Sequence, residues 1–339
     1  MKSRLHHCII ALALSTGLVF AQEKPKTDAA KPVESKPAPA AKPDAKPADK
    51  ATPKPEAKPA EKKDTPKIAE KKAEPPKPEA KPAAPPPAPV FKDKNLEAAV
   101  RRQVFAKRET KEPLYAADVE NVSIIQGKGL KITDLSGLEK CVALAQLELP
   151  DNEIKDITPL KGLERLQFID LARNQIADIS VLGTVKALQY LELTNNKVTN
   201  ISALGDIPAL TSIYLAGNQI ADASPLFKLP KLSSLYLDGN KITSIAGIGT
   251  CRLLGMLSLK DNQITDIAAL EPLNELRFLF LDNNKIADLA PLHRALKNDV
   301  EGAREFAPYI NIYLGGNPLN DTSKKLVEEL KALHLRITP

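Results

Sequence analysis

The sequence predicts a protein of the α/β class, a solenoid whose short parallel strands form one concave sheet. The first observation is a period of 22 residues within the 339-residue chain. Leucine occupies the first position of seven periods, at Leu144, Leu166, Leu188, Leu210, Leu232, Leu254 and Leu276. The second observation is an asparagine eight residues after each leucine, at Asn152, Asn174, Asn196, Asn218, Asn240, Asn262 and Asn284. Such periods are typical of solenoids, in which each coil buries its apolar face against its neighbours.

Each period has the pattern L-x-x-[LI]-x-L-x-x-N-x-[IV], which resembles the leucine-rich repeat signature. The L-x-x-L-x-L part predicts a short strand, because side chains alternate between the two faces of a strand. The asparagine predicts a turn, since its side chain is able to hydrogen-bond backbone groups. A coil of this length leaves too few residues for a full return helix. We therefore expect a horseshoe with 3₁₀ or extended structure on its convex side.

Position 13 of each coil predicts a helical turn at the start of the return segment. It holds only residue types that cap helical turns: Asp134, Asp156, Asp178, Asn200, Asp222, Ser244, Asp266 and Asp288. Pro159, Pro225 and Pro291 follow three positions later, where no backbone donor is needed. A column of carboxylates also suits calcium, but asparagine and serine interchange with aspartate here as they do in caps. We predict no metal site and no cofactor.

The segment before the repeat array is predicted to cover the apolar face of the first coil. Residues 90–121 are predicted to form an N-terminal helical cap, because Leu96, Val100 and Val104 have helical spacing. The repeats themselves are assigned to residues 122–320, and their first coil is degenerate.

The end of the array is covered in a similar way. The separation between Leu276 and the equivalent Tyr309 is 33 residues, one period with an insertion of 11. Residues 321–339 are predicted to form a C-terminal cap, with Leu326, Leu330 and Leu333 on one face of a helix.

Two further segments precede the folded part. Residues 1–21 are predicted to be an export signal peptide, because Lys2 and Arg4 precede an apolar run too short to cross a bilayer. Residues 22–89 contain 18 of the 29 prolines and no aromatic residue, which predicts a disordered linker rich in lysine, proline and alanine. We expect an exported protein in the periplasm, on the cell surface or in the medium, with no transmembrane span after signal cleavage.

The positive charge of the chain belongs to these leading segments. The net charge is +6, but residues 22–89 contain 16 lysines against 11 acidic residues, and Lys2 and Arg4 add two positive charges. The remaining residues have a net charge of −1. Nucleic-acid binding depends on clustered positive charge, so we predict no nucleic-acid partner for the folded part.

Residues 90–339 resemble the internalins and related exported bacterial proteins with 22-residue repeats. This resemblance implies a concave parallel sheet that binds a ligand, as internalins bind host receptors. The chain departs from the internalin pattern because it has no LPxTG wall-sorting motif and carries its spacer before the repeats. The resemblance therefore implies the fold and a binding role more than adhesion to a host.

Residues suited to catalysis are few in the chain after the leader. Cys141 and Cys251 occupy an otherwise apolar position of their coils, which predicts two core thiols. They lie five coils apart, roughly 24 Å, which is too far for a disulfide. His293 and His334 are the two histidines, and no HExxH, P-loop or GxSxG motif occurs. We predict a protein that is not an enzyme.

The strand positions between the buried leucines form the candidate binding site. Positions 3 and 5 of each coil face the concave side because side chains alternate, and seven of the 14 aromatic residues fall in these 16 positions. When position 7 is included, the face carries five acidic residues and one lysine, Lys260. The candidate ligand-binding residues are Phe168, Asp170, Tyr190, Glu192, Tyr214, Tyr236, Asp238, Met256, Phe278, Phe280, Asp282 and Tyr313.

These residues support a binding face for a protein or peptide ligand. Exposed aromatic residues anchor protein interfaces, and the negative charge favours a partner with basic groups. In a second interpretation, the aromatic residues only pair across neighbouring coils and stiffen the sheet. Two other functions stay open. The same face suits a cell-wall or surface polysaccharide, and the cationic residues 22–89 suit a cell-envelope scaffold held to peptidoglycan or an anionic surface polymer.

Overall fold

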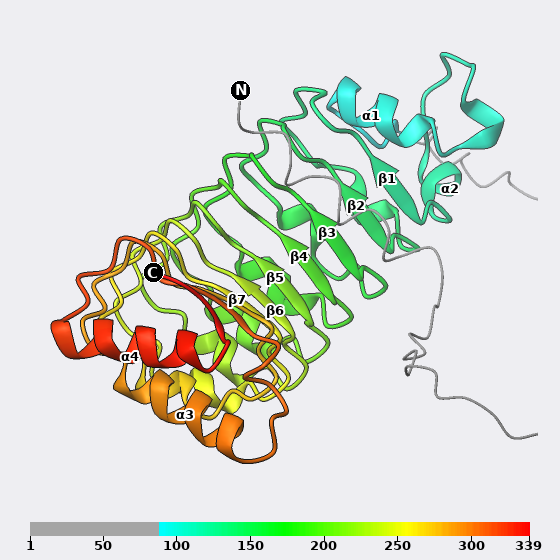
Figure 1. Cartoon of the computed structure of the whole chain (residues 1–339). Helices are drawn as coiled ribbons and strands as arrows, with labels where there is room; N and C mark the ends of the chain where they lie inside the picture. The colour runs from blue at the N-terminus through cyan, green and yellow to red at the C-terminus, as the bar shows by residue number, and fades with distance from the viewer. Residues whose placement is uncertain (1–87) are drawn as a thin grey trace, which may run out of the picture. The chain divides into compact units, whose positions relative to one another are not determined.

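The computed structural model describes residues 88–339, which form a row of stacked coils with one continuous sheet (Figure 1). The predicted export signal, residues 1–21, lies outside the described residues, as does the predicted linker apart from its last two residues. Among residues 88–339, no helix combines the length and the hydropathy needed to cross a bilayer.

The sheet has ten strands of three residues each, all parallel and arranged in sequence order. They are β1 (Ile124–Gln126), β2 (Gln146–Glu148), β3 (Phe168–Asp170), β4 (Tyr190–Glu192), β5 (Ser212–Tyr214), β6 (Ser234–Tyr236), β7 (Met256–Ser258), β8 (Phe278–Phe280), β9 (Asn311–Tyr313) and β10 (Arg336–Thr338). From β1 to β8, paired residues are 22 positions apart, as Tyr190 and Ser212 are. The predicted repeat period is therefore the register of the sheet.

The return segments from the first coil to the seventh contain 3₁₀ turns, as expected. They are η3 (Leu138–Lys140), η4 (Thr158–Leu160), η5 (Ser180–Thr184), η6 (Ser202–Asp206), η7 (Ser224–Lys228), η8 (Ile248–Thr250) and η9 (Ala268–Leu270). The position-13 side chain precedes each turn and accepts the backbone N–H two residues later, as Asp178 Oδ1 does from Ser180 at 2.8 Å. All eight position-13 residues make this bond. The cap prediction is nevertheless wrong in its position, because the cap residue is a later one, such as Ile179 before η5, and makes no side-chain cap bond.

The repeated asparagines form a ladder that joins each coil to the coil before it. Asn196 Oδ1 accepts the N–H of Ile176 at 3.0 Å, and Asn196 Nδ2 donates to the carbonyls of Leu171 and Leu193, each at 3.0 Å. The other six repeated asparagines make the same three contacts in their own coils. Their buried amides thus satisfy backbone groups that the turn leaves without a partner.

The core runs along the whole array between the strands and the return segments. The central residue of each strand from β1 to β9 is fully buried, because the alternation of side chains directs it inward. Cys141 and Cys251 lie in this core as free thiols, as predicted. Burial raises the pKa of both thiols, to about 12 for Cys141, so both stay protonated and act as small apolar residues.

The first coil is covered by α1 (Lys94–Arg101), followed by η2 (Phe105–Lys107) and α2 (Ala116–Val119). Asp93 caps α1 by accepting the N–H groups of Asn95 and Leu96. Gly127 takes the place of the third apolar residue of the repeat, and a Cβ there would lie 3.2 Å from Ala99 Cβ and 2.9 Å from Leu149 Cδ2. The glycine therefore lets the cap helix approach the first strand.

The last coils differ from the 3₁₀ or extended returns that we expected. The insertion after β8 forms an α-helix, α3 (Ala290–Glu301), because eleven extra residues give room for about three turns, and it buries Leu292 and Leu296. The C-terminal helix α4 (Asp321–Ala332) lies beside α3 at the end of the array (Figure 1). Strand β10, which the repeat pattern does not predict, follows α4 and pairs in parallel with β9.

Candidate ligand-binding face

The twelve predicted site residues lie on one face of the sheet, the concave face. Most come from the first and third positions of β3–β9, and Asp238 and Asp282 follow β6 and β8 two residues beyond the strand. Every one of the twelve is half-buried. The intervening strand residues, such as Ile169 and Leu191, are fully buried, so the core is complete beneath the face.

Four aromatic rings on consecutive strands form a continuous stack, the aromatic ladder: Phe168, Tyr190, Tyr214 and Tyr236. The ring centroids of Phe168 and Tyr190 are 4.2 Å apart with an interplanar angle of 4°. The next two steps are 5.2 Å at 37° and 4.8 Å at 18°. The ladder moves from position 3 on β4 to position 5 on β5, which explains the tilted middle step. The expected pairing of rings across coils is therefore present.

A second group of rings, the aromatic cluster, covers β8 and β9 and consists of Phe278, Phe280 and Tyr313. Phe280 and Tyr313 are stacked with their centroids 4.7 Å apart, and Phe278 lies 6.2 Å from Phe280. Lys260 Nζ is 4.6 Å from the centroid of the Phe280 ring, a cation–π contact. Met256 lies between ladder and cluster, where its sulfur contacts the hydroxyl of Tyr236.

The tyrosines of the ladder are hydrogen-bond donors at neutral pH. Burial raises the pKa of Tyr190, Tyr214 and Tyr236, in the last case to about 12, and the neighbouring Glu192 raises the pKa of the first two further. Their hydroxyls therefore stay protonated, so the ladder offers both ring surface and polar groups to a ligand.

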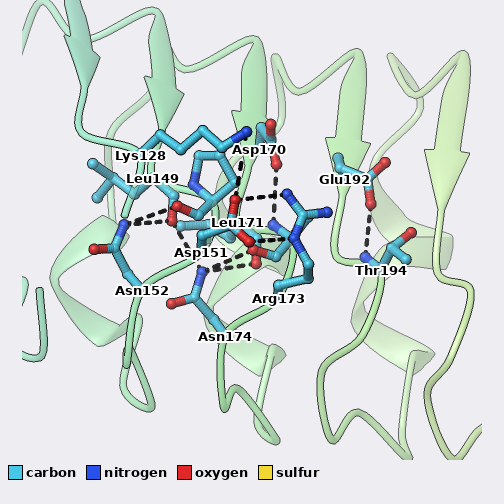
Figure 2. A network of polar contacts seen from close by, with 12 residues as sticks. Lys128, Leu149, Asp151, Asn152, Asp170, Leu171, Arg173, Asn174, Glu192 and Thr194 are labelled. Carbon is cyan, nitrogen blue, oxygen red and sulfur yellow. Dashed lines mark hydrogen bonds and ion pairs between the residues drawn. The ribbon is translucent and has the colours of Figure 1, made fainter. Parts of the chain in front are cut away.

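Three carboxylates occupy the last position of β2, β3 and β4. Glu148 accepts side-chain amide groups of Gln126 and Gln146. Asp170 accepts the N–H of Ala172 at 3.0 Å, and Glu192 accepts the N–H of Thr194 at 2.7 Å (Figure 2). Strand pairing places Asp170 next to both Glu148 and Glu192.

Burial raises the pKa of Asp170, and the neighbouring Glu148 raises it further. Burial also raises the pKa of Glu192 to about 7, an increase to which Asp170 adds and which Arg173 and the contacts with Thr194 oppose. Titratable groups with such perturbed pKa values concentrate at functional sites.

The basic side chains nearest to this column are paired elsewhere. Arg173 makes a two-point ion pair with Asp151, with Nη2 2.8 Å from Oδ2, and Lys128 Nζ lies 3.6 Å from the same carboxylate (Figure 2). Across residues 88–339, no salt bridge reaches Asp170 or Glu192. Sequence reasoning missed Arg173, although its spacing of 22 residues from Asp151 gives a detectable signal.

The two acidic residues of position 7 each contact two other residues. Asp238 accepts the hydroxyl of Ser258 and the N–H of Lys260. Asp282 accepts the N–H of Gly315 at 3.0 Å and lies 3.9 Å from Lys260 Nζ. No cluster of three or more histidine, cysteine, aspartate or glutamate side chains suited to a metal ion occurs in the described part of the chain.

The stacked coils, the asparagine ladder and the parallel sheet define the class of the protein. It is a leucine-rich repeat solenoid. Solenoids of this kind present extended concave surfaces and typically act as scaffolds for protein interactions.

Comparisons with known proteins agree with this class. The family "Leucine Rich repeats (2 copies)" matches residues 164–206 and 208–249, and the family "Leucine rich repeat" matches residues 230–286. An internalin C2 from Listeria monocytogenes is 28% identical, with a TM-score of 0.57, 61% of this chain and 92% of that chain being covered. The repeat region is therefore internalin-like. A comparison with curated proteins finds no match.

A more distant likeness extends to plants. The leucine-rich repeat ectodomain of the membrane receptor kinase GASSHO1/SCHENGEN3 from Arabidopsis thaliana, solved in complex with CASPARIAN STRIP INTEGRITY FACTOR 2, is 19% identical with a TM-score of 0.50. The match covers 59% of this chain and 25% of that chain. At this identity the likeness concerns the fold alone.

Proposed function

We propose that the protein is an exported, non-catalytic recognition module that holds a protein or peptide ligand with basic groups across its concave face. The binding role is supported by the leucine-rich repeat class and by the acidic and aromatic character of the face. Export is supported by the signal-like residues 1–21, which lie outside the described residues. We place its action in the periplasm, on the cell surface or in the medium.

The aromatic ladder is the observation that carries this proposal. Its rings stay half-buried although Ile169 and Leu191 complete the core beneath them. Stacked rings have already lost most of their rotational freedom. A ligand that contacts them therefore causes little further loss of side-chain entropy in the protein. Stiffening of the sheet and ligand binding are therefore compatible roles of the same rings.

The stacking geometry favours a peptide over a polysaccharide. A sugar ring packs on the open face of an aromatic ring, whereas Phe168 and Tyr190 lie nearly parallel and use these faces on each other. The ring edges and the tyrosine hydroxyls are the parts left for a ligand. Such groups suit the mixed polar and apolar surface of a peptide.

The test uses the immobilised full chain and a displayed library of random peptides. We expect selected peptides to bind the wild type and the Tyr214→Phe/Tyr236→Phe variant, which keeps both rings. We expect the Tyr214→Ala/Tyr236→Ala variant to bind at least about tenfold more weakly, because truncation of an aromatic anchor costs roughly 1–4 kcal/mol. Isothermal titration calorimetry with the selected peptides measures the difference.

Two controls complete the test. A Lys197→Ala/Lys241→Ala variant changes exposed residues outside the twelve-residue site and should bind like the wild type. Thermal unfolding measures how much stability the Tyr214→Ala/Tyr236→Ala variant loses because the two rings no longer stack. Equal binding by the alanine and phenylalanine pairs would refute the proposal, and so would a loss of binding that only follows a loss of folded protein.

The alternatives give different results with purified peptidoglycan. Sedimentation that is lost on deletion of residues 22–89 identifies an envelope scaffold held by its cationic segment. Sedimentation that survives this deletion but is lost in the tyrosine-to-alanine pair identifies polysaccharide binding by the concave face.

A further inference from the structure

Most of the free charge of the concave face lies in its N-terminal half. Asp170 and Glu192 occupy paired positions on β3 and β4, adjacent strands about 4.8 Å apart. Within residues 88–339, no lysine, arginine or histidine nitrogen lies within 4.0 Å of either carboxylate. The same two strands carry Phe168 and Tyr190, the closest stack of the aromatic ladder. This half therefore offers unpaired carboxylates beside ring surface.

The C-terminal half carries less free charge and more aromatic surface. Asp238 is engaged by Ser258 and by the backbone of Lys260, and the Lys260 ammonium lies between Asp282 and the ring of Phe280. Lys260 thus compensates Asp282, whereas Asp238 is held by hydrogen bonds alone. The remaining surface of β8 and β9 is the aromatic cluster.

The two halves favour different ligand groups. Half-buried carboxylates without a cation are costly, because burial disfavours the charged form, and a cationic ligand group removes this cost. Its aliphatic stem would pack beside Phe168 and Tyr190. An apolar ligand group binds more favourably over the aromatic cluster than over Asp170 and Glu192. At the cluster it removes apolar surface from water without desolvating an unpaired charge.

We infer that the ligand crosses the strands with a fixed polarity, its arginine or lysine side chains over β2–β4 and its apolar segment over β8 and β9. This inference rests on the proposed function. Six strand spacings separate β3 from β9, roughly 29 Å at about 4.8 Å each. That span matches about nine residues of extended peptide.

The probe is a synthetic peptide of twelve residues with three arginines at one end, three leucines at the other and a glycine–serine spacer. A benzophenone group is attached to either end, and the peptide is irradiated with the full chain. Mass spectrometry should locate cross-links from the arginine end on β2–β5 and from the leucine end on β7–β9. Cross-links from both ends that spread evenly over the strands would overturn the inference.

A charge-matched pair of variants tests the carboxylates. Asp170→Asn/Glu192→Gln should weaken binding of the peptide by about tenfold or more, because both charge-assisted contacts are lost. At pH 8, where Glu192 is mostly ionised, Glu153→Gln/Glu164→Gln removes nearly the same charge from exposed positions outside the site. This control pair should change binding by less than about twofold, because exposed charges are screened. Equal effects of the two pairs would contradict a specific role of Asp170 and Glu192.

A peptide with citrulline in place of arginine completes a double-mutant cycle. It should bind the wild type as weakly as the arginine peptide binds Asp170→Asn/Glu192→Gln, and that variant should not distinguish the two peptides. The citrulline peptide is measured against the wild-type protein alone, so the result is informative even if the Asp170→Asn/Glu192→Gln variant misfolds. If the wild type binds the citrulline peptide as tightly as the arginine peptide, the inference is refuted. If neither this peptide nor the library-selected peptides bind the concave face, the proposed function itself fails, whereas binding there without polarity removes only the inference.

Discussion

Glu192 shows how one residue of the face links protonation to stability. Its folded-state pKa of about 7 lies above its ordinary value of 4.5. Between these values the folded chain holds a proton that the unfolded chain has released. Stability therefore falls as the pH rises through this window, and the full cost is present above about pH 7.

We predict that Glu192→Gln stabilises the protein at pH 8 and changes its stability little at pH 4. Glutamine keeps an oxygen for the N–H of Thr194 but has no charge to bury. The gain at pH 8 should be on the order of 1–3 kcal/mol, since one pKa unit corresponds to about 1.4 kcal/mol. Urea unfolding of the full chain at both pH values measures it.

Glu153→Gln is the control for this experiment, because Glu153 is exposed. Its effect should be small and equal at the two pH values. A Glu192→Gln variant with the same change in stability at pH 4 and pH 8 would contradict the assignment of an unpaired buried carboxylate.

At the residue scale, the sequence indicates which side chains share the face but not which of them are paired. Glu148, Asp170 and Glu192 occupy equivalent positions of three coils. Only the folded chain shows that Glu148 receives two amide donors and that Arg173 turns to Asp151. These pairings depend on side-chain rotamers, which the repeat period does not determine.

The asparagine ladder is the element that fixes the geometry of each coil. We predict that Asn196→Ala destabilises the protein by about 2–5 kcal/mol. The substitution leaves the N–H of Ile176 and the carbonyls of Leu171 and Leu193 without their amide partner, and a buried unpaired group costs about 1–3 kcal/mol. The free energy of unfolding in urea at pH 7 measures the loss.

Gln219→Ala is the matched control for the ladder, because Gln219 is an exposed amide in the next coil. It should change the free energy of unfolding by less than about 0.5 kcal/mol. Similar losses in both variants would show that the buried amide has no special role in the turn.

At the element scale, prediction succeeded where the period holds and failed where it ends. The strands β2–β9 follow from the apolar positions, and the 3₁₀ turns follow from the length of the coil, although the position-13 side chains bond just before the turns and do not cap them. Helix α3 was missed because its residues interrupt the period, and β10 was missed because Arg336–Thr338 lacks the repeat signature. Both elements depend on contacts with their neighbours, which a local pattern does not contain.

At the scale of the whole molecule, stability is distributed along one direction, since each coil contacts mainly its neighbours. Helix α4 buries Val327 and Leu330 at the C-terminal end, and Ser323 Oγ accepts the N–H of Leu289. We predict that Val327→Ala/Leu330→Ala accelerates hydrogen exchange of the amides in β8–β10 and leaves β2–β4 nearly unchanged. Hydrogen exchange followed by mass spectrometry resolves these regions.

Glu328→Ala serves as the control in α4, because Glu328 is exposed. It should leave exchange in β8–β10 close to the wild-type rate. Faster exchange spread evenly over all ten strands would show that the array unfolds as one cooperative unit, contrary to the prediction.

The fold of the whole molecule could be predicted because one period repeats seven times, and the position of the concave face follows from strand alternation. The division of that face into a charged and an aromatic half could not. It depends on which carboxylates find a cation, as Asp282 does in Lys260 and Asp170 does not within residues 88–339.

The constant register of the strands has a consequence for how such a molecule changes in size. Duplication of one 22-residue unit would add a strand in phase with its neighbours and lengthen the face by about 4.8 Å. Insertion of a single residue within a strand would instead turn that coil's buried leucines toward solvent. Addition of whole 22-residue units is therefore compatible with the fold. Each added unit would lengthen the peptide ligand that the face accommodates by about one and a half residues.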